Sequence, residues 1–398
     1  MTQVYSKALD KTISTARIIG RLEGKTKGPS IVFFGGIHGN ETAGVFALKE
    51  VFDQLSSINI QGNAIAVSGN LKALETNQRY IDSDLNRLWT HSNLEAIETS
   101  DATNCEQKEQ NELFQILKDI ISSNTGPFYF IDLHTTSSKT LPFITINDAL
   151  INRKFSYLFP VPIVLGIEEY LNGPLLSYIN ELGYVSLGFE SGQHNDKDAI
   201  SNSISFIHLA LAHSKVLKPE SIAGLPIYHN QLKGQSRGLD KIYEVVYMHE
   251  IRNGDAFQMN LGFESFESIN KGTFLAQNNG IKINSKYSAK LFMPLYQKKG
   301  REGFFLIREI KPFFLRLSET LRTYNVDKLL VILPGISWDN KKKHVLKVNL
   351  KVPVSFAKSF FHLLGYRNKY VNSTHIKLFN REKIAKVNMY KNEFWFKK

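Results

Sequence analysis

The chain has 398 residues, of which 42% are hydrophobic, so it is long enough for two or three domains that each bury a core. No apolar run reaches the roughly 18 residues needed to cross a bilayer, and the first residues lack the basic-then-apolar pattern of a secretory signal. The single cysteine, Cys105, can form no internal disulfide, which suits a reducing compartment. We therefore expect a cytoplasmic protein that has no membrane contact and does no cysteine chemistry.

The net charge of +12 is concentrated at the end of the chain. Residues 341–398 hold thirteen Lys and two Arg against two Glu, a balance of +13 that leaves −1 for all the preceding residues. A basic segment of this kind can bind nucleic acid or an acidic partner, but surface lysines more often interact only with water. We therefore do not expect nucleic acid as a partner.

Strand-like and helix-like patterns alternate through the first half of the chain. Residues 31–34 form an apolar run ahead of two glycines, which predicts a buried strand and a turn, and Asn40 is placed to cap the helix that follows. Further strand-like runs lie at 64–67, 128–133, 163–165 and 185–189, and a helical stripe is formed by Ile200, Ile204, Ile207 and Leu211. This alternation predicts an α/β domain with a partly parallel sheet over residues 1–220.

The second half of the chain has different patterns. From about Leu225, short strands and turn residues predict a β-rich domain over residues 221–312, with turns at 253–255, 270–272 and 278–280. Residues 313–398 predict a basic α+β module. In it, Leu346, Val348, Leu350 and Val352 alternate with polar residues as in a strand, and a helix over 355–364 ends at Gly365.

Three residues of the first domain can bind zinc. His38 and Glu41 follow the first strand, and His134 follows a later one. Two imidazoles and one carboxylate leave a fourth coordination position for water, which is the pattern of a catalytic zinc. A His and a Glu at this spacing also occur as an ordinary surface pair, but the two glycines before His38 would let the backbone pass close to a ligand. Asp132 could support His134 or be a plain turn carboxylate.

Two more segments carry charge next to predicted strands. Residues 78–87 contain two arginines and two aspartates, and arginine suits carboxylates and developing oxyanions, although ordinary ion pairs in a loop would have the same composition. Glu190 ends an apolar strand, where burial of a carboxylate without a purpose would be costly. Ligands collect at the carboxyl ends of strands in such sheets, so we expect His38, His134 and Glu190 to converge.

Four motifs taken together resemble the succinylglutamate desuccinylase and aspartoacylase family of zinc-dependent deacylases, which is related to the zinc carboxypeptidases. The motifs are GGIHGNE at 35–41, QRYIDSDLNR at 78–87, DLHTTSS at 132–138 and GFESG at 188–192. The resemblance covers about residues 30–215 strongly and the β-rich region weakly, and the final basic module has no counterpart in aspartoacylases. It implies a zinc carboxypeptidase-like mixed sheet flanked by helices, then a small β domain and the basic α+β module.

The resemblance also implies a role for each site residue. His38, Glu41 and His134 would hold one zinc per chain, and Glu190 would be the general base that activates water. Arg79 would polarise the scissile carbonyl, while Asn86 and Arg87 would hold a substrate carboxylate with Asp84 steadying the arginines. Tyr296 is a further substrate-binding candidate, because its segment is similar to one that brings a tyrosine to the aspartoacylase site.

One departure from the family bears on the substrate. Aspartoacylases carry an arginine about ten residues before the base, for the side-chain carboxylate of the substrate, and residues 175–185 contain none. The missing arginine argues against N-acetylaspartate as the substrate. We expect a hydrolase that cleaves the amide bond of a small N-acylated amino acid or a related amide. The alternatives are a zinc carboxypeptidase acting on short peptides and a binding protein that works through its basic C-terminal module. A homo-oligomeric assembly is left open.

Overall fold

The computed structural model describes residues 1–397 apart from 57, 100–101, 340–343, 350–359 and 372–373. Within these residues, one large mixed sheet has eleven strands. Their order is β12 (Ser268–Ile269), β15 (Ala289–Phe292), β16 (Glu302–Glu309), β10 (Ile242–Glu250), β8 (Ile163–Leu165), β7 (Phe143–Ile146), β9 (Val185–Gln193), β6 (Phe128–Thr136), β4 (Ser30–Gly35), β5 (Asn63–Ser68) and β3 (Ile18–Glu23). The chain therefore has the large mixed sheet that its strand pattern predicted.

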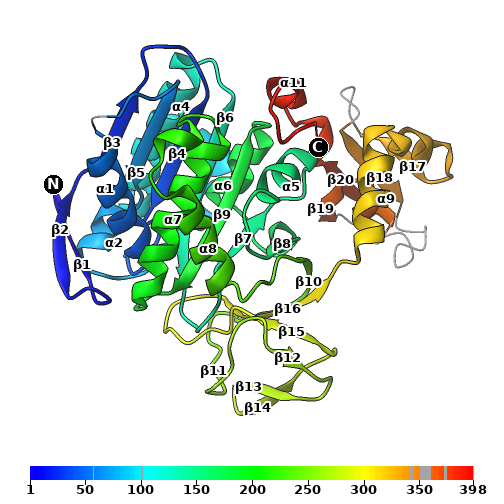
Figure 1. Cartoon of the computed structure of the whole chain (residues 1–398). Helices are drawn as coiled ribbons and strands as arrows, with labels where there is room; N and C mark the ends of the chain where they lie inside the picture. Colours follow the sequence, from blue (N-terminus) through cyan, green and yellow to red (C-terminus); the bar gives the residue numbers. More distant parts are fainter. Residues whose placement is uncertain (57, 100–101, 340–343, 350–359, 372–373, 398) are drawn as a thin grey trace.

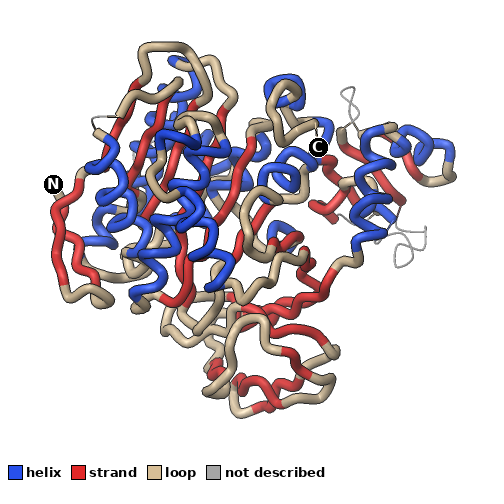
Figure 2. The backbone as a smooth tube through the Cα atoms, viewed as in Figure 1, coloured by secondary structure: helices blue, strands red, loops and turns tan. Residues whose placement is uncertain are grey.

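Helices cover both faces of the central strands (Figure 1, and by colour in Figure 2). One face carries α1 (Ala43–Leu55), α7 (Lys197–His213) and α8 (Leu225–Gln235), and the other carries α4 (Cys105–Ser123) and α6 (Leu175–Glu181). The smaller helices up to Ser221 are α2 (Leu71–Glu75), α3 (His91–Thr99), α5 (Leu150–Ser156), η1 (Leu85–Arg87), η2 (Ile167–Glu169) and η3 (Pro219–Ser221). None of the helices described has the length and apolar character of a membrane span.

The pattern of β4 explains why this sheet is buried on both sides. Ile31 and Phe33 pack into the hydrophobic cluster under α1 and α7, whereas Val32 and Phe34 pack into the cluster under α4. A continuous apolar run is what a parallel strand with two covered faces requires. Strands β5, β4, β6 and β9 are parallel neighbours, so their carboxyl ends lie at one edge of the sheet.

Residues 221–312 contribute strands to two sheets. β10, β12, β15 and β16 extend the large sheet, while β11 (Phe257–Met259), β13 (Phe274–Asn278) and β14 (Ile281–Asn284) form a small one. The prediction of short strands from Leu225 was wrong for its first eleven residues, which form α8. Pro226 in the first turn favours the start of a helix, and Leu232 is buried in the hydrophobic cluster under α1 and α7. The three-part division of the chain remains a proposal about its organisation.

The C-terminal region forms a four-stranded sheet beside α9 (Pro312–Thr323). Its order is β17 (Ile336–Trp338), β18 (Val345–Asn349), β20 (His375–Asn380) and β19 (Tyr366–Val371). Leu346 and Val348 are buried as the alternation predicted, but Leu350 and Val352 lie outside the described residues. So do residues 355–359 of the predicted helix, whose remainder is helical at 360–363 and is followed by Gly365 at a φ of +89°.

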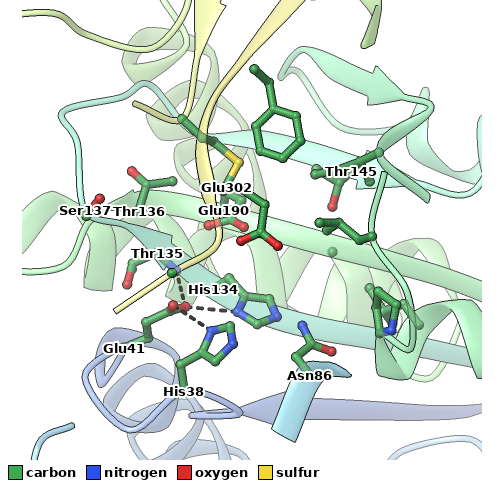
Figure 3. Close-up of a pocket in the computed structure, with 18 of the residues that line it drawn as sticks. His38, Glu41, Asn86, His134, Thr135, Thr136, Ser137, Thr145, Glu190 and Glu302 are labelled. Carbon is green, nitrogen blue, oxygen red and sulfur yellow. Dashed lines mark hydrogen bonds and ion pairs between the residues drawn. The ribbon is translucent and has the colours of Figure 1, made fainter. Parts of the chain in front are cut away.

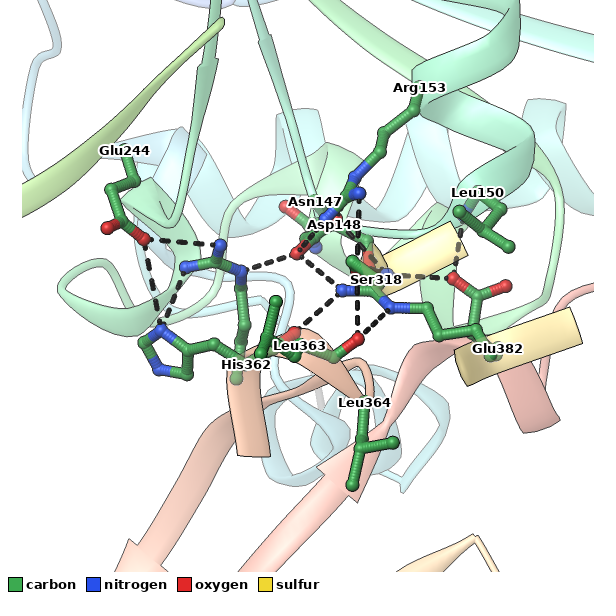
Figure 4. Close-up of polar contacts among 12 residues, drawn as sticks. Asn147, Asp148, Leu150, Arg153, Glu244, Ser318, His362, Leu363, Leu364 and Glu382 are labelled. Carbon is green, nitrogen blue, oxygen red and sulfur yellow. Dashed lines mark hydrogen bonds and ion pairs between the residues drawn. The ribbon is translucent and has the colours of Figure 1, made fainter. Parts of the chain in front are cut away.

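A cluster of arginines around one buried aspartate joins this region to the large sheet (Figure 4). The Asp148 carboxylate accepts from Arg153 Nε of α5 at 2.6 Å, from Arg322 Nη2 of α9 at 2.9 Å and from Arg367 Nε of β19 at 2.6 Å. Burial by itself would raise the pKa of Asp148, but the three guanidinium groups hold it well below its usual range. We name Asp148, Arg153, Arg322 and Arg367 the Asp148 cluster.

Candidate functional site

The structure brings His38, Glu41 and His134 together at the carboxyl ends of β4 and β6 (Figure 3). Glu41 lies between the two imidazoles, with Oε1 2.8 Å from Nδ1 of His38 and Oε2 2.9 Å from Nδ1 of His134. The three residues are at most 8% exposed, and one ligand atom from each lies within 4.8 Å of the other two. We name these residues the metal-ligand cluster, and their donor set fits zinc.

Two further carboxylates orient the imidazoles from behind. Asp84 Oδ1 lies 3.1 Å from Nε2 of His38, and Asp132 Oδ2 lies 2.7 Å from Nε2 of His134. A carboxylate on the second ring nitrogen fixes a ligating histidine and raises its basicity. This contact leaves Nδ1 of each histidine directed at the Glu41 carboxylate. The supporting role that the sequence left open for Asp132 thus has a geometric basis.

The turn before α1 positions His38 and Glu41, but two local expectations were wrong. The backbone N–H of Glu41 donates to the carbonyl of His38, so α1 begins only at Ala43 and Asn40 lies too early to cap it. Asn40 instead donates to Gln297. Gly35 and Gly36 pack against the chain rather than a ligand, because an added Cβ would lie 3.0 Å from Leu48 Cδ1 at Gly35 and 2.9 Å from Leu74 Cδ1 at Gly36.

Glu190 enters the same pocket from β9, in parallel register with His134 of β6 (Figure 3). Its side chain is buried, and its Oε2 has no hydrogen-bond partner among the described residues. Burial raises the pKa of Glu190 to about 8, with Glu41 adding to the rise and His134 opposing it. A buried carboxylate that tends to hold its proton near neutral pH is suited to accept and return one.

The arginines of the segment 78–87 line the pocket and are held by carboxylates. Arg79 donates to Asp84 Oδ2 through Nη2 at 3.0 Å, and Arg87 donates to Glu302 of β16 through Nη2 at 2.8 Å. Burial would raise the pKa of Asp84, but His38 and Arg79 hold it well below its usual range. Asp84 therefore positions His38 as well as Arg79. Asn86 also lines the pocket, and its Oδ1 accepts from the backbone of Leu175.

Tyr296 does not line this pocket. Its hydroxyl donates to the backbone carbonyl of Asn260 at 2.8 Å, and its side chain borders a separate hollow. The neighbouring Gln297 lines the pocket instead and contacts both Asn40 and His194. The geometry therefore gives no support to a substrate contact by Tyr296, because a backbone contact holds its hydroxyl away from the site.

Sequence reasoning missed several other polar residues of the pocket, including Glu168 of η2, His194 after β9, Gln297 and Glu302. His194 follows the GFESG motif by two residues, and Gln297 follows Tyr296 in the segment similar to the aspartoacylase one, so both lie beside a local signal. Glu168 and Glu302 come from segments whose patterns carry no sign of a site.

Comparison with known proteins agrees with this geometry. Residues 27–208 match the model of the succinylglutamate desuccinylase/aspartoacylase catalytic domain. The chain is 33% identical over 108 residues to a succinylglutamate desuccinylase of Photorhabdus laumondii, which covers 27% of this chain and 33% of that one. It is 36% identical over 109 residues to an N-acyl-aromatic-L-amino acid amidohydrolase of Xenopus tropicalis, which covers 27% and 34%. The matched part thus spans about a third of these relatives.

A solved structure shows the same fold over a longer stretch. The succinylglutamate desuccinylase/aspartoacylase of Rhodobacter sphaeroides superposes with a TM-score of 0.54 at 15% identity, covering 73% of this chain and 88% of that one. Sheet and pocket together define an α/β protein with a metal-ligand cluster at the carboxyl ends of parallel strands. Residues 27–208, a little less than half of the chain, are thus similar to the catalytic domain of the succinylglutamate desuccinylase/aspartoacylase family.

Proposed function

We propose that the chain is a zinc-dependent hydrolase that cleaves the amide bond of a small N-acylated amino acid or a related amide. The observation that carries this proposal is the unpartnered, buried carboxylate of Glu190 beside the metal-ligand cluster. The names of the relatives support it, because both describe hydrolysis of an acylated amino acid.

Each site residue has a chemical task in this proposal. The chemistry that a bound zinc ion supplies is a pKa of water lowered toward about 7. Glu190 accepts the proton of the attacking water and passes it to the leaving amine. Arg79, held by Asp84, directs its guanidinium at the oxygen on which negative charge develops, which stabilises the transition state more than the ground state.

In this proposal, Asn86 and Arg87 bind a carboxylate of the substrate. Both line the pocket, and Arg87 offers a planar fork that suits a carboxylate. Glu302 already contacts Arg87, so a substrate carboxylate would share this guanidinium with it or displace it. We propose this pair of residues as the anchor for the amino-acid part of the substrate.

The test compares substrates and variants on the zinc-loaded protein. We expect about one zinc per chain, release of free amine from N-acetyl or N-succinyl amino acids, and little cleavage of dipeptides. Glu190→Gln should keep its zinc and lose turnover, while His38→Ala should lose zinc. Cleavage of dipeptides alone would favour a carboxypeptidase, and a Glu190→Gln variant with normal turnover would overturn the proposal.

A further inference from the structure

The pocket continues along β9 beyond the metal-ligand cluster. Ser186, Gly188 and Glu190 alternate with Leu187 and Phe189, so they share the face of the strand that lines the pocket. Ser186 and Glu190 are four residues apart, or ~13 Å along a strand that rises 3.3 Å per residue. The reacting end of the pocket at Glu190 and its far end at Ser186 are thus separated by about the length of an extended side chain together with the groups that surround it.

Gly188 keeps this passage continuous. A Cβ at Gly188 would lie 2.4 Å from Oγ1 of Thr145 on the neighbouring strand β7, so any larger residue would push into the space between the two strands. Without that Cβ, the pocket reaches from Glu190 past Thr145 to the residues that follow β7 and β8.

Glu168 lies in the lining of this far end. It belongs to η2, directly after β8, and its side chain is only 6% exposed. Its Oε1 accepts from the backbone N–H of Asp148 at 3.1 Å, but its Oε2 has no hydrogen-bond partner among the described residues. A buried carboxylate oxygen without a partner is costly, so it is the atom in this part of the pocket with most to gain from a ligand.

No neighbouring cation is free to neutralise Glu168 within the described part of the pocket. Arg79 and Arg87, the two arginines of the lining, are bonded to Asp84 and Glu302. Arg367 attracts Glu168 from outside the lining, but its own hydrogen bonds go to other acids. Asn147, Ser177 and Ser186, which also line the pocket, are neutral, and the other charged groups that act on Glu168 are the acids Glu169 and Asp148.

We propose that Glu168, with Thr145, Asn147, Ser177 and Ser186, forms a subsite for an ammonium group at the end of a long substrate arm. We name these five residues the Glu168 subsite. The inference rests on the proposed function and narrows its substrate class to N-acylated amino acids that carry a basic arm. An ammonium would supply the missing donor to Oε2, whereas a carboxylate in its place would meet like charge.

The pKa of Glu168 is consistent with this role. Burial raises the pKa of Glu168 to about 7, so the side chain is poised between its neutral and ionised forms near neutral pH. A cation bound at Oε2 would favour the ionised form. Neutral arms could also enter the passage but would gain no charge-assisted hydrogen bond there.

The experiment compares matched pairs of substrates on the zinc-loaded, full-length protein. Nα-acetyl-lysine and Nα-acetyl-norleucine differ in the ammonium on the amino-acid side, and aminohexanoyl-alanine and hexanoyl-alanine differ in it on the acyl side. We expect kcat/KM to favour one ammonium-bearing member by about 10- to 100-fold, the range for a hydrogen bond to a charged group. The pair that shows the preference identifies which arm enters the subsite.

Glu168→Gln should abolish that preference, because glutamine keeps the shape of the side chain and removes its charge. The matched control is Glu169→Gln, which changes the adjacent acid whose Oε1 faces Arg367 and which does not line the pocket. Isothermal calorimetry with free lysine and norleucine gives a second readout that needs no turnover. Stronger binding of lysine by the wild type, lost in Glu168→Gln, is expected.

The outcomes separate the two proposals. If no acylated amino acid is cleaved, the proposed function fails, and calorimetry still tests the subsite. If neutral substrates are cleaved and neither ammonium pair shows a preference, the function stands and the subsite is overturned. A preference that survives in Glu168→Gln overturns the subsite proposal as well, because some other group would then bind the ammonium.

Discussion

Replacement of Asp148 by asparagine should lower the free energy of unfolding by more than any single substitution at the protein surface. Asp148 is fully buried, and three arginines from α5, α9 and β19 converge on its carboxylate. The Asp148→Asn variant would keep the volume of the side chain but leave the three guanidinium groups without this negative charge. Because α9 and β19 belong to the C-terminal region, the change weakens its attachment to the large sheet.

The expected loss follows from the burial of these charges. Breaking a buried ion pair by removing one partner costs about 3–5 kcal/mol, since the other charge stays buried without compensation. Glu382 and Glu169 retain contacts with Arg322 and Arg367, which places the expected loss toward the lower end of that range. About 3 kcal/mol would still be a large fraction of the 5–15 kcal/mol that stabilises a typical protein.

Urea unfolding of the full chain, followed by tryptophan fluorescence, measures this loss. The matched control is Asp53→Asn, which removes an aspartate whose side chain is 60% exposed and is paired with Lys49 four residues away in α1, and it should cost less than about 1 kcal/mol. The pKa of Asp148 lies well below its ordinary value, so its stabilisation is present above about pH 4 and lost as the pH falls further. The difference in the free energy of unfolding between the wild type and Asp148→Asn should therefore become smaller below about pH 4. Equal stability of Asp148→Asn and Asp53→Asn at neutral pH would refute the reasoning.

Three further predictions concern the pocket. Arg79→Met should lower kcat by about 10²- to 10³-fold without changing the zinc content measured by atomic absorption, and loss of zinc would show a structural role instead. Burial raises the pKa of Glu168 to about 7, above its value in the unfolded chain. Ionisation of this group therefore lowers the stability of the folded protein as the pH rises from the unfolded value through about 7. Glu168→Gln should therefore raise the melting temperature relative to wild type more at about pH 8 than at about pH 5; an equal difference at both would contradict the burial argument. A chelator should lower the melting temperature, and equimolar zinc should restore it, because a ligand that binds only the folded state stabilises it; no shift in either direction would count against zinc at the metal-ligand cluster.

Much of the candidate site could be predicted because its residues lie next to strong local signals. His38 and Glu41 follow a strand with a continuous apolar run, and Glu190 ends another, so their place at the carboxyl edge of the sheet follows from parallel topology. Asn40 shows the limit of this reasoning. A side chain that is a good helix cap in isolation instead contacts Gln297, which is 257 residues away.

The amino-acid sequence by itself thus determined the α/β class, the strands that carry the metal-ligand cluster and the resemblance to a known family, because hydrophobic periodicity and close-spaced motifs are local properties. Only the tertiary structure decided which acids meet which cations. Glu302 meets Arg87 across 215 residues, and Arg367 meets Asp148 across 219. Pairings of this kind depend on how strands from distant segments are ordered in one sheet, and burial then sets the charge of groups such as Glu168 and Glu190. No local pattern encodes which acid meets which cation or how deeply a carboxylate is buried, since both arise from the sum of long-range contacts.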